Sequence, residues 1–201
     1  VCPSARAGRP GPSPAGGRTP GDTGRLMADA LERMAPVAIA RLHGHVVGGG
    51  LVLAAACDLR VAADDVRFSI PEVDLGIPLA WGGIPRLVRE IGPALTKELV
   101  MTCRPFDAAE AKAAGFLNRV VPAADLDAEV DELAEAVASR PRFAVLATKA
   151  HTNAVTEQMV GLARSWSDAD GLAGGLRDSE GRAARTQYLE KLMQAKHGSD
   201  T

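Results

Sequence analysis

The chain has 201 residues with 46% hydrophobic and 24% charged residues and a net charge of −2, a composition typical of one globular domain. The near-neutral charge and the 3% aromatic content argue against a nucleic-acid partner. Apolar stretches are far shorter than the about 20 residues of a membrane span, and we expect no signal peptide, no membrane partner and a cytoplasmic location. Three cysteines without a Cys-x-x-Cys pair predict free thiols.

The composition changes sharply near residue 25. Residues 1–25 are rich in Pro, Gly and Arg and contain no Leu, Ile, Met or aromatic residue, which predicts a loop or a disordered tail. Behind a Thr23 cap, apolar residues recur at helical spacing from Leu26 to Met34 and predict a helix. The expected regions are this tail at 1–25, a core at 26–140 and a C-terminal helical region at 141–201.

Strand and helix patterns alternate through the first half of the predicted core. The glycines at 48–50 separate the end of a strand from an uncharged, alanine-rich helix, which we expect to be buried. Pro71 ends the last strand of this half. The predicted elements are strands at 37–42, 46–47, 59–63 and 66–70, and the uncharged helix at 51–57.

Helical patterns dominate the second half. Gly92-Pro93 separates two short helices, and Asp107 with Glu110 has the spacing of a helix-capping pair. Because strands come early and helices late, the sequence predicts an α/β domain whose sheet is built by the first half. The predicted elements are helices at 84–89 and 94–101, a capped helix from 107 to Gly115, a strand at 116–121, and helices at 126–137, 143–155, 157–169 and 180–194.

The run Gly48-Gly49-Gly50 is the sharpest local feature of the sequence. Glycines between a strand and a helix let the backbone approach a ligand and leave N–H groups that can bind an oxyanion or a phosphate. No Gly-Lys-Ser/Thr follows, which excludes a phosphate loop, and Leu53 stands where the third small residue of a dinucleotide fingerprint belongs. A nicotinamide-dependent oxidoreductase is therefore a remote alternative, and glycines needed only for tight packing are another.

Several segments in register resemble the signature of the enoyl-CoA hydratase/isomerase, or crotonase, superfamily. The triple glycine follows His43-Gly44-His45, and the stretch from Phe68 through Pro71-Glu72 to Gly76 resembles the family's F-x-x-P-E-x-x-x-G segment. Together the matches span about residues 30–184. The matching segments are residues 36–40, 43–50, 54–62, 67–77, 82–87 and 105–122, with further matches at Lys149, Asn153 and 180–184.

The resemblance implies a crotonase fold, in which repeated β-β-α turns form a spiral core and C-terminal helices, here 141–201, build homotrimers or hexamers. It also implies an acyl-CoA thioester as substrate, with coenzyme A as part of that substrate and no separate cofactor or metal. The thioester would form an enolate stabilised by two backbone N–H groups. Gly49 matches the position of the second donor, and its neighbours Gly48 and Gly50 would line the substrate site.

The first donor of the family lies in an A-G-x-D-like turn well before the middle glycine, behind several sheet strands. Val1–Gly8 lacks that pattern, and Ala15–Arg18 resembles it but lies too close to Gly49. The sequence therefore predicts a domain that is truncated at its N-terminus, without its first strands.

Two positions decide which reaction the resemblance predicts. Family hydratases carry one Glu after the middle glycine and another in the P-E segment, and here these positions hold Val52 and Glu72. Hydration requires one carboxylate to orient water and another to deliver a proton. A single carboxylate can shuttle a proton between two carbons of an enolate. We therefore expect Glu72 to act as general acid/base in an isomerase-type reaction. A catalytically impaired acyl-CoA-binding or assembly subunit is the alternative.

Four further residues are weaker candidates. Leu79 and Trp81 would line an acyl pocket together with Val52, although packing alone explains both equally well. Lys149 would reach the phosphates of coenzyme A, although a solvated helix face is an equal alternative. Asp74 would face away from Glu72 on an extended segment, and we expect it to be structural.

Overall fold

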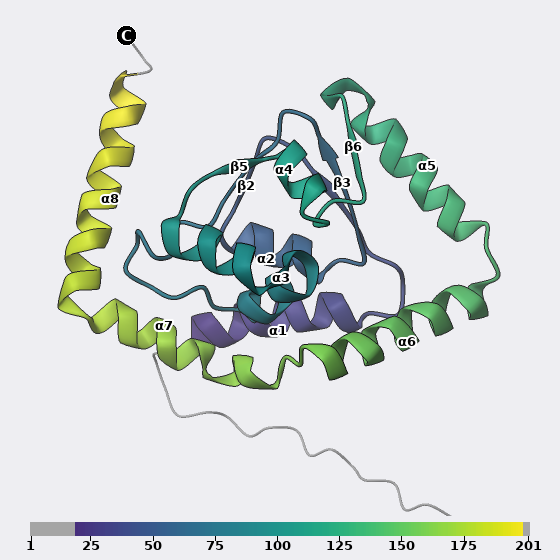
Figure 1. Ribbon diagram of the computed structural model, residues 1–201, viewed down its shortest axis with the longest axis horizontal. Helices are drawn as coiled ribbons and strands as arrows, with labels where there is room; N and C mark the ends of the chain where they lie inside the picture. The colour runs from purple at the N-terminus through teal and green to yellow at the C-terminus, as the bar shows by residue number, and fades with distance from the viewer. Residues whose placement is uncertain (1–18, 199–201) are drawn as a thin grey trace, which may run out of the picture.

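The computed structural model describes residues 19–198, within which six short strands form two separate three-stranded sheets (Figure 1). In the first sheet β3 lies between β1 and β6, and both pairs are parallel. In the second sheet β4 lies between a parallel β2 and an antiparallel β5. The strands are β1 (Ile39–Leu42), β2 (His45–Val47), β3 (Leu59–Ala63), β4 (Arg67–Ser69), β5 (Phe106–Asp107) and β6 (Arg119–Val121).

The chain passes from one sheet to the other at each short turn. β1 leads through Gly44, which has φ +61, into β2, and β3 leads through the turn Asp64-Asp65 into β4. The two strands predicted at 59–63 and 66–70 are therefore present but do not pair with each other. Each such pair is followed by a helix, so the core repeats a β-β-α unit as the family resemblance implies.

Helix α2 lies at the centre of the molecule (Figure 1). α2 packs against α1 and α3 and contains no charged residue. Its Leu51 and Val52 are fully buried, and each contributes about 1.5–3 kcal/mol by its removal from water. This packing fixes the N-terminus of α2. The helices are α1 (Thr19–Arg33), α2 (Gly49–Ala56), α3 (Gly83–Thr102), α4 (Ala108–Ala113), α5 (Leu126–Ala138), α6 (Arg142–Met159), α7 (Asp168–Arg177) and α8 (Ser179–Gly198), with 3-10 turns at Ala123–Asp125 and Ala163–Ser167.

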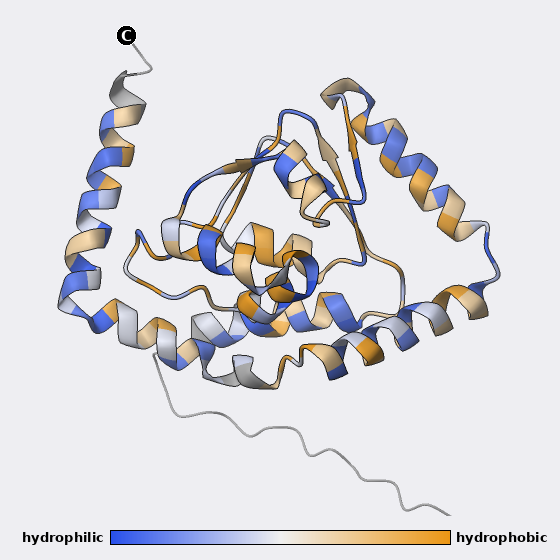
Figure 2. Cartoon of the chain, in the orientation of Figure 1, coloured by the Kyte–Doolittle hydropathy of each residue, from blue (hydrophilic) through white to orange (hydrophobic). Residues whose placement is uncertain are grey.

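Three aromatic side chains pack together beside the second sheet. The Phe68 ring on β4 stacks on that of Phe106 with 5.1 Å between centroids and meets the edge of Phe116 at 5.9 Å. Figure 2 shows hydrophobic residues gathered in the strands and in α2, while the outer helices carry polar residues on much of their surface. The core therefore lies between the sheets and α2.

Helices α5 to α8 form the outer part of the molecule, and α8 projects from the body (Figure 1). Several of their apolar side chains are exposed, among them Phe143 (85%), Met159 (77%) and Met193 (67%). The oligomerisation role expected for 141–201 stays a prediction. None of the helices within residues 19–198 has both the length and the hydropathy needed to cross a bilayer.

The first helix begins earlier than the composition indicates. α1 starts at Thr19 and not behind a Thr23 cap, so residues 19–25, expected in the tail, belong to the helix. The glycines that suggested a loop serve packing instead, because Gly21 lies against Ala169 of α7 and Gly24 lies against an indole ring. The remainder of the predicted tail, 1–18, lies outside the described residues.

The helix predicted over 157–169 is not formed as one element. α6 ends at Met159, a 3-10 turn follows, and α7 begins at Asp168. The Glu157 side chain accepts the N–H of Leu162 at 2.9 Å and so stabilises the break, while Asp168 accepts the N–H of Gly82 at 2.8 Å. Tertiary contacts therefore override the helical pattern here.

Candidate active site

The triple glycine begins helix α2 at the end of strand β2. Gly48 has φ +49 and ψ −113, a conformation that favours glycine, and its N–H donates to the carbonyl of Ser69 at 3.0 Å. Its own carbonyl accepts the N–H of Val52 at 3.1 Å. The N–H groups of Gly49 and Gly50 precede the helical hydrogen bonds and cannot be used by the helix itself. Because α2 carries no charged side chain, its N-terminus keeps the positive end of the helix dipole.

Glu72 reaches this helix end through the pairing of β2 with β4. The two strands are parallel, with Val47 opposite Ser69, so the chain leaves both at the same edge of the sheet. Glu72 then sits in a turn in which its carbonyl accepts the N–H of Ile77 at 2.9 Å. Its Oε1 atom lies against Gly48, and a Cβ atom on that glycine would overlap the carboxylate.

The Glu72 carboxylate is half-buried, and hydrogen bonds do not fully replace the water that burial removes from it. Its Oε2 atom is buried and has no hydrogen-bond partner among the residues that the structure describes. Burial raises the pKa of Glu72 above its usual value of 4.5, and a hydrogen bond from its own backbone lowers the pKa to a lesser extent. A carboxylate in this environment is a stronger base than one in water. Glu72 is therefore equipped to take up and return a proton.

Replacing Gly48 with Ala is expected to lower the free energy of unfolding by about 2 kcal/mol and to displace Glu72. The added Cβ atom would sit at a left-handed φ and would overlap the carboxylate. Gly44→Ala is the matched control, because Gly44 has φ +61 but open space around its Cα. Urea unfolding should show a smaller loss for the control, about 1 kcal/mol. Equal losses in the two variants would contradict the close contact between Gly48 and Glu72.

A cavity of about 140 Å³ lies beside the N-terminus of α2. The structure brings five of the predicted site residues together around it, namely Gly49, Val52, Glu72, Leu79 and Trp81. Gly50 is exposed and does not line this cavity, and Gly48 lies behind the carboxylate. The lining residues are Gly49, Val52, Glu72, Ile77, Pro78, Leu79, Ala80, Trp81 and Leu172.

The chemistry of this cavity is simple. Its lining is apolar apart from the Glu72 carboxylate and the backbone at Gly49. A single half-buried base and the first residue of a helix therefore line the same small cavity. Such a constellation suits the removal of a proton from carbon next to a carbonyl group whose oxygen the N–H stabilises.

Comparison with known proteins assigns the family. Residues 20–197 match the family described as enoyl-CoA hydratase/isomerase. The chain belongs to this family. It is 36% identical over 172 residues to the crotonyl-CoA hydratase of Syntrophomonas wolfei, covering 85% of this chain and 65% of the relative. It is 33% identical over 176 residues to the short-chain-enoyl-CoA hydratase of Clostridium acetobutylicum, covering 87% of this chain and 67% of the relative.

The solved structures agree with this assignment and confirm the predicted crotonase fold. An enoyl-CoA hydratase from Mycobacterium avium matches with a TM-score of 0.78 and 25% identity, over 87% of this chain and 68% of that one. The chain spans about two thirds of the length of these family members. The segments in which the first oxyanion donor was sought, Val1–Gly8 and Ala15–Arg18, lie outside the described residues.

Lys149 does not lie at the cavity that holds Glu72. Its Nζ atom pairs with the Asp58 carboxylate at 2.7 Å and donates to the carbonyl of Pro36 at 2.8 Å. The side chain is only 8% exposed, so it is not available on a solvated helix face either. Its charge compensates a partly buried carboxylate, and the two contacts attach α6 to the segments before β1 and β3. Lys149 thus joins α6 to the core in this structure, and its expected contact with a coenzyme A phosphate stays a prediction.

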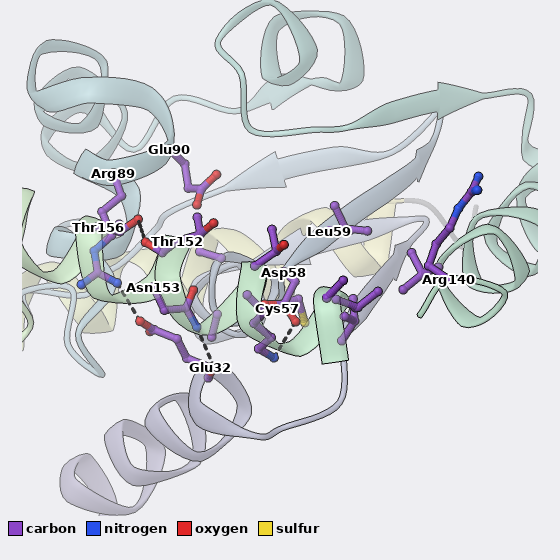
Figure 3. A pocket seen from close by; sticks show the side chains of 18 of the residues that line it. Glu32, Cys57, Asp58, Leu59, Arg89, Glu90, Arg140, Thr152, Asn153 and Thr156 are labelled. Atoms are coloured by element: carbon purple, nitrogen blue, oxygen red, sulfur yellow. Dashed lines mark hydrogen bonds and ion pairs between the residues drawn. The ribbon is translucent and has the colours of Figure 1, made fainter. Parts of the chain in front are cut away.

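Lys149 lines a larger cavity of about 550 Å³ between α6 and the core (Figure 3). Two ion pairs lie there, between Arg89 and Glu32 at 2.7 Å and between Lys149 and Asp58 at 2.7 Å. Burial raises the pKa of the Cys57 thiol, which keeps it protonated. This cavity is larger but contains neither Glu72 nor the start of α2, so it is not the candidate active site.

The loop that carries Glu72 is held by a contact between glycines. Gly76, with φ +66, meets Gly181 so closely that a Cβ atom on either residue would overlap the other's backbone. A Cβ atom on Gly175 would lie 2.7 Å from the carbonyl oxygen of Gly76. The end of α7 and the start of α8 therefore fix the loop after Glu72. Sequence reasoning missed this role, although the Glu180-Gly181 segment was a signal for it.

Asp74 is exposed and lies outside the cavity.

Proposed function

We propose that this chain acts on an acyl-CoA thioester through an enolate and moves a proton between two carbons, as an isomerase, in preference to hydration. One observation carries the proposal. Glu72 is the single carboxylate on an apolar cavity at the N-terminus of α2, and the position expected for a second carboxylate is Val52, which is fully buried.

In the proposed reaction the thioester oxygen accepts a hydrogen bond from the N–H of Gly49. Negative charge develops on this oxygen as Glu72 removes a proton from the neighbouring carbon, and the positive end of α2 stabilises that charge. One such donor typically lowers the barrier by about 3 kcal/mol. Glu72 then returns the proton to the same carbon or to the carbon at the far end of the enolate. Its raised pKa supports both steps, because the group has to gain and lose a proton.

Hydration would need more than this cavity offers. A water molecule adding to a double bond has to be oriented and deprotonated while the substrate carbon is protonated, which is work for two carboxylates. Val52 contributes only aliphatic surface. The names of the two relatives, crotonyl-CoA hydratase and short-chain-enoyl-CoA hydratase, support an acyl-CoA substrate, while Val52 is the reason to place this chain on the isomerase side.

The second candidate is an acyl-CoA-binding or assembly subunit without catalysis. The same Val52 favours it, because loss of one carboxylate is also what an impaired family member would show. The homotrimer or hexamer implied by the family stays a prediction that sedimentation analysis of the chain would test.

The test is α-proton exchange of butyryl-CoA in deuterium oxide, followed by NMR, together with conversion of a 3-enoyl-CoA to a 2-enoyl-CoA. The full chain is expected to catalyse both and to hydrate the 2-enoyl-CoA much more slowly. Binding of butyryl-CoA without exchange would favour the acyl-CoA-binding subunit. Hydration as fast as isomerisation would contradict the proton-shuttle proposal, and binding of a nicotinamide cofactor without affinity for butyryl-CoA would favour the oxidoreductase.

A further inference from the structure

Trp81 has an unusual backbone conformation for a large side chain. Its φ is +61, which bulky residues adopt only where the surroundings hold them. The Nη1 atom of Arg86 in α3 donates to the Trp81 carbonyl at 2.9 Å. The next N–H, that of Gly82, donates to Asp168 of α7 at 2.8 Å. Hydrogen bonds on both sides therefore fix the residue in this position.

The indole ring packs against two helices, α1 and α2. One part of the ring lies against Gly24 of α1 and another against Gly49 of α2, and a Cβ atom on either glycine would overlap it. Both helices thus lack a side chain where the ring passes. Trp81 also lines the cavity of Glu72, whereas no residue of α1 does. The ring therefore forms the wall between this cavity and α1.

The cavity that the ring bounds beside Glu72 is small. The cavity measures about 140 Å³, and its other apolar walls include Val52, Leu79 and Leu172. Apolar cavities of roughly 150 Å³ in proteins hold a molecule of the size of benzene. A short acyl group has about this volume, and the indole ring occupies the space toward α1 into which a longer chain could otherwise extend.

We propose that the Trp81 ring sets the length of the acyl chain and restricts the substrates of this site to short-chain acyl-CoA thioesters of about four to six carbons. The inference rests on the proposed function, because it concerns the acyl group bound beside Glu72. It makes Trp81 the specificity-determining residue of the cavity, with Gly24 and Gly49 as the positions that admit its ring.

The test compares α-proton exchange of four-carbon and ten-carbon acyl-CoA in the full chain and in Trp81→Gly. Glycine is the residue best suited to φ +61, so this variant removes the ring without straining the backbone. The natural chain is expected to prefer the four-carbon thioester by at least about 100-fold in kcat/KM, because each methylene that does not fit costs about tenfold or more. In Trp81→Gly the preference should fall below about tenfold.

Two further variants distinguish the effect of the indole ring from a general effect of substitution. Trp81→Phe keeps an aromatic ring and should retain most of the preference. Phe143→Ala removes an 85% exposed ring from α6 and should change nothing. Thermal unfolding of each variant verifies that it is folded.

Unchanged chain-length preference in folded Trp81→Gly, or no preference in the natural chain, would overturn the inference and leave the proposed function standing. If acyl-CoA binds without exchange, the catalytic proposal fails and the same comparison is made with dissociation constants from calorimetry, where the ring should produce the same order of preference. If no acyl-CoA of either length binds, both proposals are overturned.

Discussion

Replacing Glu72 with Gln is expected to reduce the rate of α-proton exchange by about 10²–10⁴-fold, the usual contribution of a general acid/base. Gln keeps the size of the side chain but cannot take up a proton, and the contact with Gly48 and the cavity are retained. The affinity for butyryl-CoA should change little, since the carboxylate acts on the reacting carbon rather than on the coenzyme. Exchange at an undiminished rate would show that another base is used.

The same variant is expected to be more stable than the natural chain at neutral pH, by about 1 kcal/mol. The pKa of Glu72 is raised by burial, so the folded state resists ionisation that the unfolded state undergoes freely. Below the usual pKa of 4.5 the carboxyl is protonated in both states and Glu72→Gln has little effect. The advantage of the variant should grow as the pH rises from 4.5 to the raised pKa and stay constant above it.

Urea unfolding at several pH values measures this difference, and Glu90→Gln is a matched control. Burial also raises the pKa of Glu90, but its carboxylate pairs with the buried Arg60. Because burial outweighs the attraction of Arg60, Glu90→Gln should also gain stability as the pH rises above 4.5, but by less than Glu72→Gln, since Arg60 loses a charged partner. Destabilisation by Glu72→Gln at pH 7 would mean that Glu72 has a compensating partner in solution.

The sequence could predict that Gly48 and Glu72 belong to one candidate site because their placement depends on local backbone. Gly48 needs its positive φ and Glu72 follows a strand by a short turn, so both are recognisable from adjacent residues. Their meeting follows from one strand pair, β2 with β4. The rest of the cavity is built by contacts between distant segments. Leu172 lies on α7, a helix that the sequence pattern did not predict, and no pattern connects it to Glu72.

Several residues make contacts that the sequence pattern did not indicate, and these contacts have a common physical cause. The Lys149 side chain, for which the sequence suggests a phosphate contact, forms an ion pair with Asp58. The composition predicts a loop at Gly21 and Gly24, but these glycines lie in α1 and allow it to approach α7 and the Trp81 ring. In each case the sequence shows what a residue is able to do, while the partner that uses it is set by tertiary packing. The turn at 64–65 is a similar case, because its two strands enter different sheets.

Replacing Arg86 with Met is expected to lower the free energy of unfolding by about 3–5 kcal/mol, the largest effect on stability that we predict. The Arg86 side chain is 1% exposed and joins α3 to α1 through Asp29 at 2.9 Å and Glu32 at 2.8 Å. It also donates to the Trp81 carbonyl at 2.9 Å. Met fills much of the same space but donates no hydrogen bond, so two carboxylates that are 9% and 19% exposed lose a cation.

Arg104→Met separates this effect from the mere loss of an arginine. Arg104 also binds two carboxylates, Glu98 and Glu110, but its side chain is 36% exposed and water can replace either partner. Its removal should cost less than about 1 kcal/mol. Chemical unfolding of both variants under the same conditions measures the difference. If Arg86→Met were as stable as Arg104→Met, Arg25 and Arg89, which also bind Asp29 and Glu32, would be sufficient to compensate the buried carboxylates, and α1 would not depend on Arg86 for its place against α3.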